Sequence, residues 1–187
     1  KSVALSGNTA LVGAYGARDW QGSAYVFVRS GTTWTEQALL TDLNGVAGDS
    51  FGYSVALSGN TALVGSICDD AAKSSAFVFV RSGTTWDKQT QLTALDGAAG
   101  DWFSWSVALY GNTALVGAIN HTVEATVRQG AVYVFRRDGT SWSQETELTA
   151  ADGATDDSFG GSVALSGDTA LVGARIDSVG ANSSQGS

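Results

Sequence analysis

The chain has 187 residues, and its 18 acidic and 10 basic side chains give a formal net charge of −8. An acidic surface argues against binding to nucleic-acid phosphates, and no apolar run approaches the ~20 residues that a membrane-spanning helix needs. Cys68 is the single cysteine, which excludes an internal disulfide or a cysteine-rich zinc site. We therefore expect neither nucleic acid as a partner nor insertion into a membrane.

An internal repeat organises the chain. The segment SVALSG, once in the form SVALYG, begins at four serines: Ser2, Ser54, Ser106 and Ser162. We therefore divide the chain into repeats 2–53, 54–105, 106–161 and 162–187, the last of which holds only the first half of the pattern. The third repeat has extra residues between Val116 and Phe135, and because its other landmarks keep their register, the insertion is predicted to lie in a loop.

Each complete repeat predicts four short strands, which the second repeat shows in order: 54–58, 61–66, 76–81 and 86–93. Gly59-Asn60 between the first two apolar runs is typical of a two-residue hairpin turn. The third segment is apolar on both faces and predicts a strand in a sheet that is covered on both sides. The fourth segment is mostly polar, which suits an edge strand. No segment has a sustained helical periodicity.

Four-stranded units of about 50 residues predict an all-β fold, a β-propeller made of antiparallel four-stranded blades. We predict a single partial propeller domain over 1–187 with about three and a half blades, whereas closed propellers have typically ~4–8 blades. An open ring exposes apolar blade faces. We therefore expect another chain, or residues beyond this sequence, to close the ring.

Two motifs carry a resemblance to a known family. Phe51-Gly52 precedes a first strand and Leu63-Val64-Gly65-Ser66 follows in the second strand, and Phe159-Gly160 with Leu171-Val172-Gly173-Ala174 repeats the pair. The pattern resembles the FG-GAP repeat of integrin α-subunit propellers and of bacterial surface proteins. Two features depart from it: Tyr15, Ile67, Ile119 and Arg175 stand where the family motif has proline, and the calcium loop of integrin-type repeats is reduced to a short hairpin. The resemblance is closest to the short-hairpin bacterial branch, and it implies an extracellular or cell-surface location on a bacterium.

Strand direction predicts which loops share a face. The turns between first and second and between third and fourth strands lie on one face and are nearly identical in all repeats. The loops between second and third strands, over 15–21, 67–74, 119–129 and 175–185, share the opposite face with the blade connectors and differ in every repeat. We call this opposite face the variable face and interpret it as the contact surface; drift in unconstrained solvated loops is the alternative. Its candidate ligand-binding residues are Arg18, Asp19, Trp20, Tyr53, Asp69, Asp70, Trp105, His121, Glu124, Arg128 and Asp177.

The connectors repeat an Asn-Gly or Asp-Gly pair followed by an aspartate. Asn44-Gly45 precedes Asp49, and the later repeats continue the series with Asp96, Asp101, Asp152 and Asp157. We favour an Asx-Gly turn whose second aspartate accepts backbone N–H bonds. A cation site formed by these carboxylates is the weaker interpretation, because two carboxylates fall short of the six to eight oxygens that calcium needs. We therefore expect no cofactor and favour no metal.

The single histidine, His121, lies in the insertion of the third repeat, and we expect it to be a solvated loop residue. No serine or cysteine has a nucleophile motif around it, so the sequence does not predict a catalytic triad. The favoured function is a non-catalytic extracellular or cell-surface adhesion module that recognises a protein or glycan. Two alternatives stay open: a carbohydrate-active enzyme with an acid/base pair of Glu124 and Asp69 or Asp70, and a scaffold with no ligand of its own.

Overall fold

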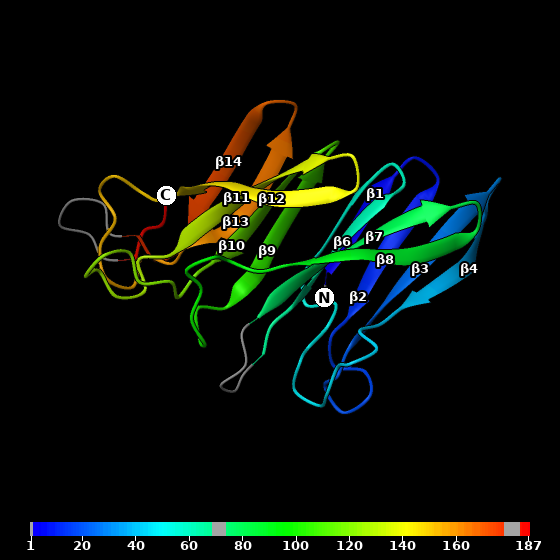
Figure 1. Cartoon of the computed structure of the whole chain (residues 1–187), viewed down its shortest axis with the longest axis horizontal. Helices are drawn as coiled ribbons and strands as arrows, with labels where there is room; N and C mark the ends of the chain where they lie inside the picture. Colours follow the sequence, from blue (N-terminus) through cyan, green and yellow to red (C-terminus); the bar gives the residue numbers. More distant parts are fainter. Residues whose placement is uncertain (1, 69–73, 178–183) are drawn as a thin grey trace.

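The computed structural model describes residues 2–68, 74–177 and 184–187, and this part of the chain is all-β, with no helix. Asp69 and Asp70 lie outside the described residues. Consecutive strands form four antiparallel sheets (Figure 1). Blade 1 holds β1 (Ser2–Ser6), β2 (Thr9–Ala14), β3 (Ser23–Ser30) and β4 (Thr33–Leu40); blade 2 holds β5 (Val55–Ser58), β6 (Thr61–Ser66), β7 (Ser75–Ser82) and β8 (Thr85–Leu92); blade 3 holds β9 (Phe103–Tyr110), β10 (Thr113–Ala118), β11 (Ala131–Asp138) and β12 (Ser141–Leu148); half-blade 4 holds β13 (Phe159–Ser166) and β14 (Thr169–Ala174).

The strand order within each blade follows the sequence, from the inner first strand to the outer edge strand. Ser58 pairs with Thr61 across the two-residue turn, where Gly59 has a φ of +57°. A positive φ is easy for glycine and unfavourable for residues with a Cβ, which is why glycine opens all four of these turns. The predicted four-stranded antiparallel units are confirmed, with strand ends shifted by one residue in blade 2. The first strands β9 and β13 begin three residues earlier than the repeat predicts, at Phe103 and Phe159.

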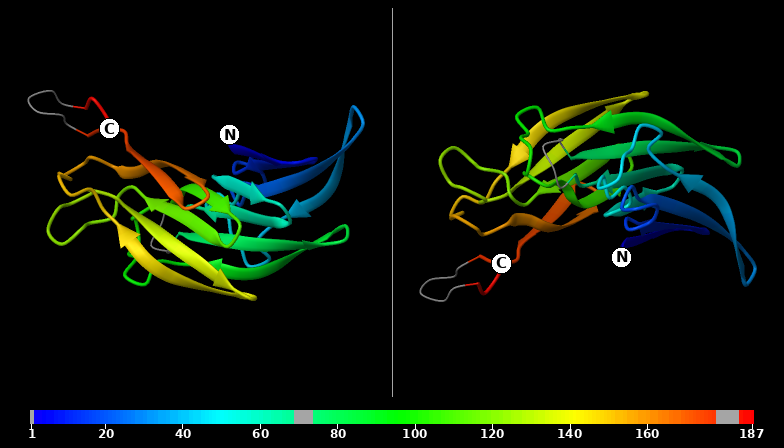
Figure 2. Two further views of the ribbon diagram at one scale, coloured as in Figure 1. Left: turned by 90° about the horizontal axis from the view of Figure 1, so that it is seen from above. Right: turned by 90° about the horizontal axis from the view of Figure 1, so that it is seen from below.

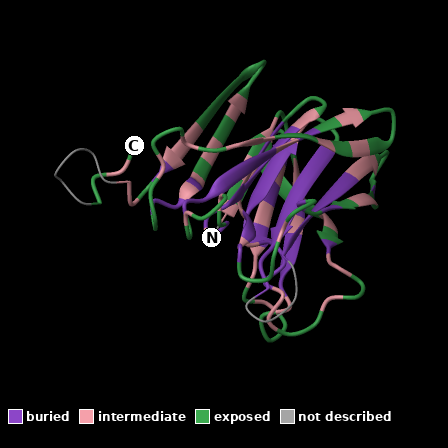
Figure 3. Cartoon of the chain, turned by 60° about the vertical axis from the view of Figure 1, so that its left-hand side comes forward, coloured by how far each residue is buried: buried purple, intermediate pink, exposed green. Residues whose placement is uncertain are grey.

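The blades stand side by side in an open arc, as the views along the sheets show (Figure 2). Blades 1 and 2 enclose one apolar cluster that contains Leu11, Val26, Phe51, Phe77 and Trp86, and blades 2 and 3 enclose a second one with Leu63, Phe103, Tyr133 and Phe135. A third, smaller cluster joins blade 3 to half-blade 4. Figure 3 shows the consequence: buried residues concentrate in the middle sheets, which are covered on both faces.

A close backbone approach explains both glycines of the repeated motifs. The Gly52 N–H donates to the Gly65 carbonyl over 2.9 Å within blade 2. A Cβ built on Gly13 of blade 1 would lie 2.0 Å from the Gly52 oxygen, and one on Gly117 would lie 2.3 Å from the Gly160 oxygen. The second strand of a blade therefore touches the Phe-Gly segment of the next blade, where there is no room for a side chain.

The ring is not closed, and both end faces are exposed. Val3 and Leu5 on the free face of blade 1 are 71% and 69% exposed, whereas their equivalents in blade 2, Val55 and Leu57, are buried. Leu171 of half-blade 4 is 73% exposed, although the matching leucines of blades 1 to 3 are almost fully buried. The structure is therefore a partial β-propeller with two unpaired blade faces.

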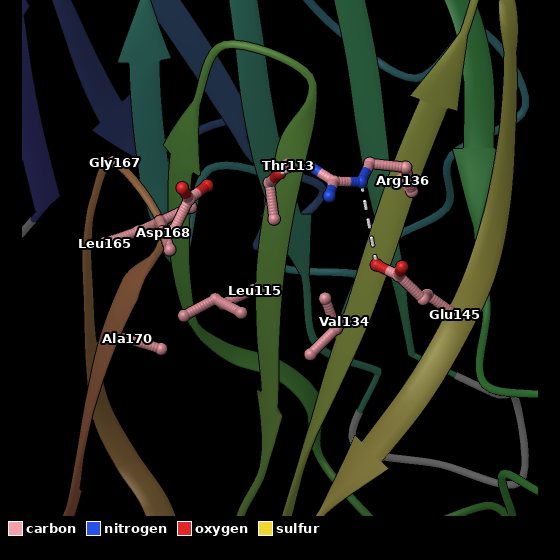
Figure 4. A pocket seen from close by; sticks show the side chains of 9 residues that line it. All are labelled: Thr113, Leu115, Val134, Arg136, Glu145, Leu165, Gly167, Asp168 and Ala170. Atoms are coloured by element: carbon pink, nitrogen blue, oxygen red, sulfur yellow. Dashed lines mark hydrogen bonds and ion pairs between the residues drawn. The ribbon is translucent and has the colours of Figure 1, made fainter.

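A cavity of about 330 Å³ lies between half-blade 4 and the face of blade 3 that is turned toward it (Figure 4). Its floor is the apolar pair Leu115 and Val134, and Leu165 closes one side. Arg136 and Glu145 form an ion pair at 3.7 Å on the other side. Between blades 1 and 2, the corresponding surface of blade 1 is covered by β7 and β8, the third and fourth strands of blade 2. Half-blade 4 has only β13 and β14 among the described residues, so the cavity is a gap in the packing of blade 3 against it.

Candidate functional site

The described parts of the loops between second and third strands and of the connectors gather at one end of the blades, opposite the hairpin turns (Figure 1). Backbone hydrogen bonds fasten loops of this end to the connector that follows their blade. Ser50 N–H donates to Trp20 O over 2.8 Å, and Phe159 N–H donates to Gln129 O over 2.8 Å. Among the described residues, the loops of blades 1 and 3 on the predicted variable face are therefore tied by backbone contacts to the segments that lead into the next blade.

A row of aromatic rings crosses the variable face. Ring centroids are 5.6 Å apart for Trp20 and Tyr15, 5.4 Å for Tyr15 and Tyr53, and 5.0 Å for Tyr53 and Trp105. Trp102 extends the row, with its ring 5.3 Å from that of Trp105 and nearly parallel to it at 11°. We call these five residues the aromatic row. The rings come from the loop after β2 in blade 1, from the segment before β5 of blade 2 and from the start of blade 3 around β9. Their spacing is that of favourable aromatic pairs.

The middle of the aromatic row borders a cavity of about 310 Å³ along the inner strands. Each repeat contributes to its lining through the serine that opens its SVALSG segment: Ser2, Ser54, Ser106 and Ser162. Tyr53, Trp105 and Gly161 line the cavity directly before three of these serines, and Val55, Val107 and Val163 line it directly after them. Because the four inner strands meet here, the aromatic row lies at one mouth of the propeller axis.

Charge and backbone strain also mark this surface. The Arg175 guanidinium lies 5.4 Å from the Trp105 ring centroid, within cation–π range. Arg18, Asp19 and Trp20 are consecutive residues with φ between +54° and +66°, and Trp102 has a φ of +54°. Bulky residues rarely adopt this conformation, and such strain is concentrated at functional sites. The position of Trp102 is a serine in the two neighbouring repeats, so only blade 3 places an indole there.

The charged candidates occupy other parts of the face. Arg18, Asp19 and Glu124 are exposed, and Asp177 is half-buried. Arg128 pairs with Asp156 at 2.5 Å, and this hydrogen bond raises the pKa of the guanidinium. The structure thus brings Trp20, Tyr53 and Trp105 into one contact row together with Tyr15 and Trp102, which sequence reasoning did not select as ligand-binding residues.

The expectation that His121 is a solvated loop residue is wrong. Its side chain is 10% exposed, and Nδ1 lies 2.8 Å from Asp101 Oδ2. Nε2 lies 3.7 Å from Asp96 Oδ2 and 3.6 Å from Glu147 Oε1. The loop folds inward because the connector binds it: Asn120 N–H donates to Asp101 O over 3.1 Å. We call Asp96, Asp101, His121, Tyr133 and Glu147 the histidine cluster.

No local sequence signal marks Tyr133 or Glu147 as members of this cluster. Glu147 lies on a polar edge strand, and Tyr133 belongs to the regular aromatic series of third strands. The Tyr133 hydroxyl donates to Asp96 Oδ1 over 2.9 Å. Burial is the main cause that raises the pKa of this hydroxyl, and the hydrogen bond to Asp96 raises it further. Burial also raises the pKa of the Glu147 carboxyl, assisted by Asp96 and opposed by His121. The environment therefore disfavours negative charge on both groups.

The connector aspartates make the backbone hydrogen bonds that the sequence predicts. Asp49 Oδ2 accepts from Val46 N–H over 2.7 Å, Asp101 Oδ2 accepts from Ala98 N–H over 2.8 Å, and Asp157 makes the same contact with Ala154 N–H. Asp152 is exposed. Each of these three accepting aspartates therefore has a structural role that needs no cation.

Comparison with protein families gives a match to the FG-GAP repeat over residues 1–27, 34–79, 86–135 and 142–187. The chain belongs to the FG-GAP repeat family. No curated protein matches it. FG-GAP repeats are typically extracellular and indicate a β-propeller-like module often involved in binding. Within the described ranges, no helix has the length and apolar character to cross a membrane.

The FG-GAP motif and the aromatic row have different roles in this protein. The matched segments break at the turns between third and fourth strands, over 28–33, 80–85 and 136–141. The motif glycines allow blades to approach, as Gly13 and Gly52 show. The aromatic row instead uses positions that vary between repeats, such as Tyr53 and Trp105, whose counterpart in half-blade 4 is Gly161. The repeat motif therefore builds the blades, and the variable positions form the candidate site.

Proposed function

We propose that this FG-GAP protein is a non-catalytic, extracellular or cell-surface binding module of a bacterium, whose ligand, a protein or a glycan, rests on the aromatic row. The observation that carries the proposal is the row itself: five rings, brought together where blades 1, 2 and 3 meet and in contact one with the next, at the mouth of the propeller axis. Packing of one blade against the next does not require aromatic rings at Trp102 or Trp105, because other repeats have serine or glycine there.

The chemistry of the row suits recognition. Tryptophan and tyrosine offer a large apolar area with few rotatable bonds, and they dominate the binding energy of many interfaces. Their faces also stack on the apolar faces of sugar rings. Arg175 over Trp105 adds a donor for a carboxylate, an amide or a hydroxyl at the edge of the row. The exposed Trp20 at the far end, 56% accessible, lengthens the surface available to an extended ligand.

A binding screen tests the proposal. The wild-type chain is applied to a glycan array, to insoluble polysaccharides and to an array of extracellular proteins, and positive probes are titrated by tryptophan fluorescence. Truncation of a central anchor such as Trp105→Ala is expected to weaken binding by about 30-fold, which corresponds to about 2 kcal/mol at an interface hot spot. Tyr53→Ala is expected to act in the same direction.

Tyr110→Ser is the matched control. Tyr110 is an exposed aromatic residue on the opposite face, and the other repeats have serine at its position, so this change removes a ring without touching the aromatic row. Equal affinity of Trp105→Ala and the wild type for every positive probe would contradict the proposal, and a chain that binds no probe would support the scaffold alternative. Hydrolysis of a bound glycan, lost in Glu124→Gln, would instead favour the enzyme alternative.

A further inference from the structure

We propose that Asp96, His121 and Glu147 form a binding site for one divalent transition-metal ion, with zinc as the best-fitting ion. The site is separate from the aromatic row and adds to the proposed function. It joins three elements that are distant in the sequence: the connector between blades 2 and 3, the insertion of the third repeat, and the outer strand β12.

The geometry is close to that of a bound ion. His121 Nε2, one Asp96 oxygen and one Glu147 oxygen all lie within 4.8 Å of one another. Nε2 is 3.7 Å from Asp96 Oδ2 and 3.6 Å from Glu147 Oε1. A tetrahedral zinc with bonds of ~2.0–2.2 Å places its ligand atoms about 3.3–3.6 Å apart. The separations of the two oxygens from His121 Nε2 are thus within a few tenths of an ångström of those that the ion requires, and the two oxygens lie within 4.8 Å of each other.

The polar atoms that face this space are poorly satisfied. The His121 side chain is nine-tenths buried, and both carboxylate oxygens near its Nε2 are beyond hydrogen-bond distance. Glu147 Oε1 is buried and has no hydrogen-bond partner among the described residues. Buried polar atoms are almost always paired, so an orphaned carboxylate oxygen that faces an imidazole nitrogen indicates a missing positive group between them. A metal ion satisfies the nitrogen and both oxygens at once.

The surrounding contacts prepare each ligand. Asp101 Oδ2 lies 2.8 Å from His121 Nδ1. An ionised carboxylate can only accept a hydrogen bond, so Nδ1–H donates to it and the Nε2 lone pair is left for the proposed ion. Ala98 N–H holds the same Asp101 oxygen. Tyr133 donates to Asp96 Oδ1, so the other oxygen, Oδ2, is the one nearest to His121. A carboxylate–imidazole–metal arrangement of this type is the usual support of a histidine ligand.

The donor set selects the class of ion. One imidazole and two carboxylates suit zinc and its neighbours in the first transition row, whereas calcium and magnesium prefer a shell made of oxygen alone. Three protein ligands leave the fourth position to water. The equivalents of Glu147 in the first two repeats are Leu39 and Gln91, so one ion is expected per chain rather than one per connector.

Metal analysis provides the test. The chelator-treated chain is dialysed against zinc, and bound zinc is measured by mass spectrometry; about one equivalent is expected. Cobalt(II) gives a second readout, since a four-coordinate site with a histidine ligand produces visible absorption. Calcium in place of zinc is expected to leave no ion bound after a short dialysis.

The variants separate ligation from folding. Glu147→Gln and Asp96→Asn keep the side-chain shapes and are each expected to weaken zinc binding by more than about tenfold, since even outer-shell changes cost 10–100-fold. Glu145→Gln is the matched control, because Glu145 is an exposed acid on the same strand that pairs with Arg136. Circular dichroism confirms the fold of each variant. No zinc retained by the wild type, or equal retention by Glu147→Gln and Glu145→Gln, would overturn the proposal, whatever the aromatic row binds.

Discussion

Glycine is required at single positions where blade backbones meet. A Cβ on Gly52 would lie 2.3 Å from Ser23 O, and the residue has a φ of +86°. In blade 3, Ser104 of β9 takes this place at a φ of +70°, and its hydroxyl accepts from Ser66 N–H over 3.1 Å. A serine is thus accommodated there by a specific hydrogen bond to the neighbouring blade, which alanine cannot form.

Gly52→Ala is expected to destabilise the chain by about 2–5 kcal/mol, the sum of left-handed backbone strain and overpacking. Gly59→Ala is the control: Gly59 also has a positive φ, but no atom lies within 4 Å of the place that an added Cβ would take, so only about 1–2 kcal/mol is expected. Urea midpoints of both variants provide the comparison. Equal losses would show that the close approach of blades does not determine the Phe-Gly motif.

At the scale of elements, each blade is stabilised mainly by the next one. Phe77 of β7 is 2% exposed and packs with Phe51 between blades 1 and 2 at a centroid distance of 5.4 Å. Its equivalent in blade 1, Tyr25, has no preceding blade and is half-buried. The blade interfaces are also polar at their outer edge, where the Trp86 indole N–H donates to Gln37 Oε1 over 3.1 Å.

Phe77→Ala is expected to cost about 3–5 kcal/mol, because it leaves a cavity between two packed sheets. Tyr25→Ala, the same change at the exposed end, is expected to cost less than about half of that, since the site is already open to water. Thermal or urea unfolding of the two variants tests this ordering. If Tyr25→Ala were the more damaging, the end face of blade 1 would have to be covered in solution.

At the scale of the whole molecule, the two end faces are complementary. Trp86 of blade 2 donates to Gln37 of blade 1, and Trp142 of blade 3 donates to Gln89 of blade 2. Glu145 of blade 3 occupies the position that these two glutamines have in blades 1 and 2. The cavity of Figure 4 lies beside this glutamate, where outer strands of a further blade would pack. Leu171 lies on the face of half-blade 4 that matches the faces buried at the interfaces that blades 1 to 3 form with the next blade. Val3 and Leu5 lie on the face of blade 1 that matches the face of blade 2 packed against blade 1.

We therefore expect residues 1–187 to associate head to tail through these faces, as exposed apolar faces of this kind promote. Light scattering and sedimentation at increasing concentration provide the measurement, and Leu171→Glu is expected to shift the distribution toward the 19.1 kDa chain. Leu43→Glu, at a highly exposed leucine in a connector, is the control. A wild-type chain that stays monomeric at all concentrations would count against association through the end faces.

The sequence alone determined the repeat, the strands and the identity of the variable face. These features are local: hairpin turns, alternating apolar residues and the double-sided third strand are encoded within a few residues of each other. The sequence also showed that Trp20, Tyr53 and Trp105 differ from their counterparts in other repeats. Their joining into one row, and the role of Trp102, required the distances between neighbouring blades.

Only the tertiary structure decided the environment of His121. Loop composition predicted solvent exposure, but Asp96 and Asp101 from the connector and Glu147 from β12 surround the ring. These residues are 20 or more positions away from the histidine in the chain, and no local pattern encodes their approach. Burial of a polar side chain depends on which distant groups can satisfy it, and that is settled only when connector, loop and edge strand pack together.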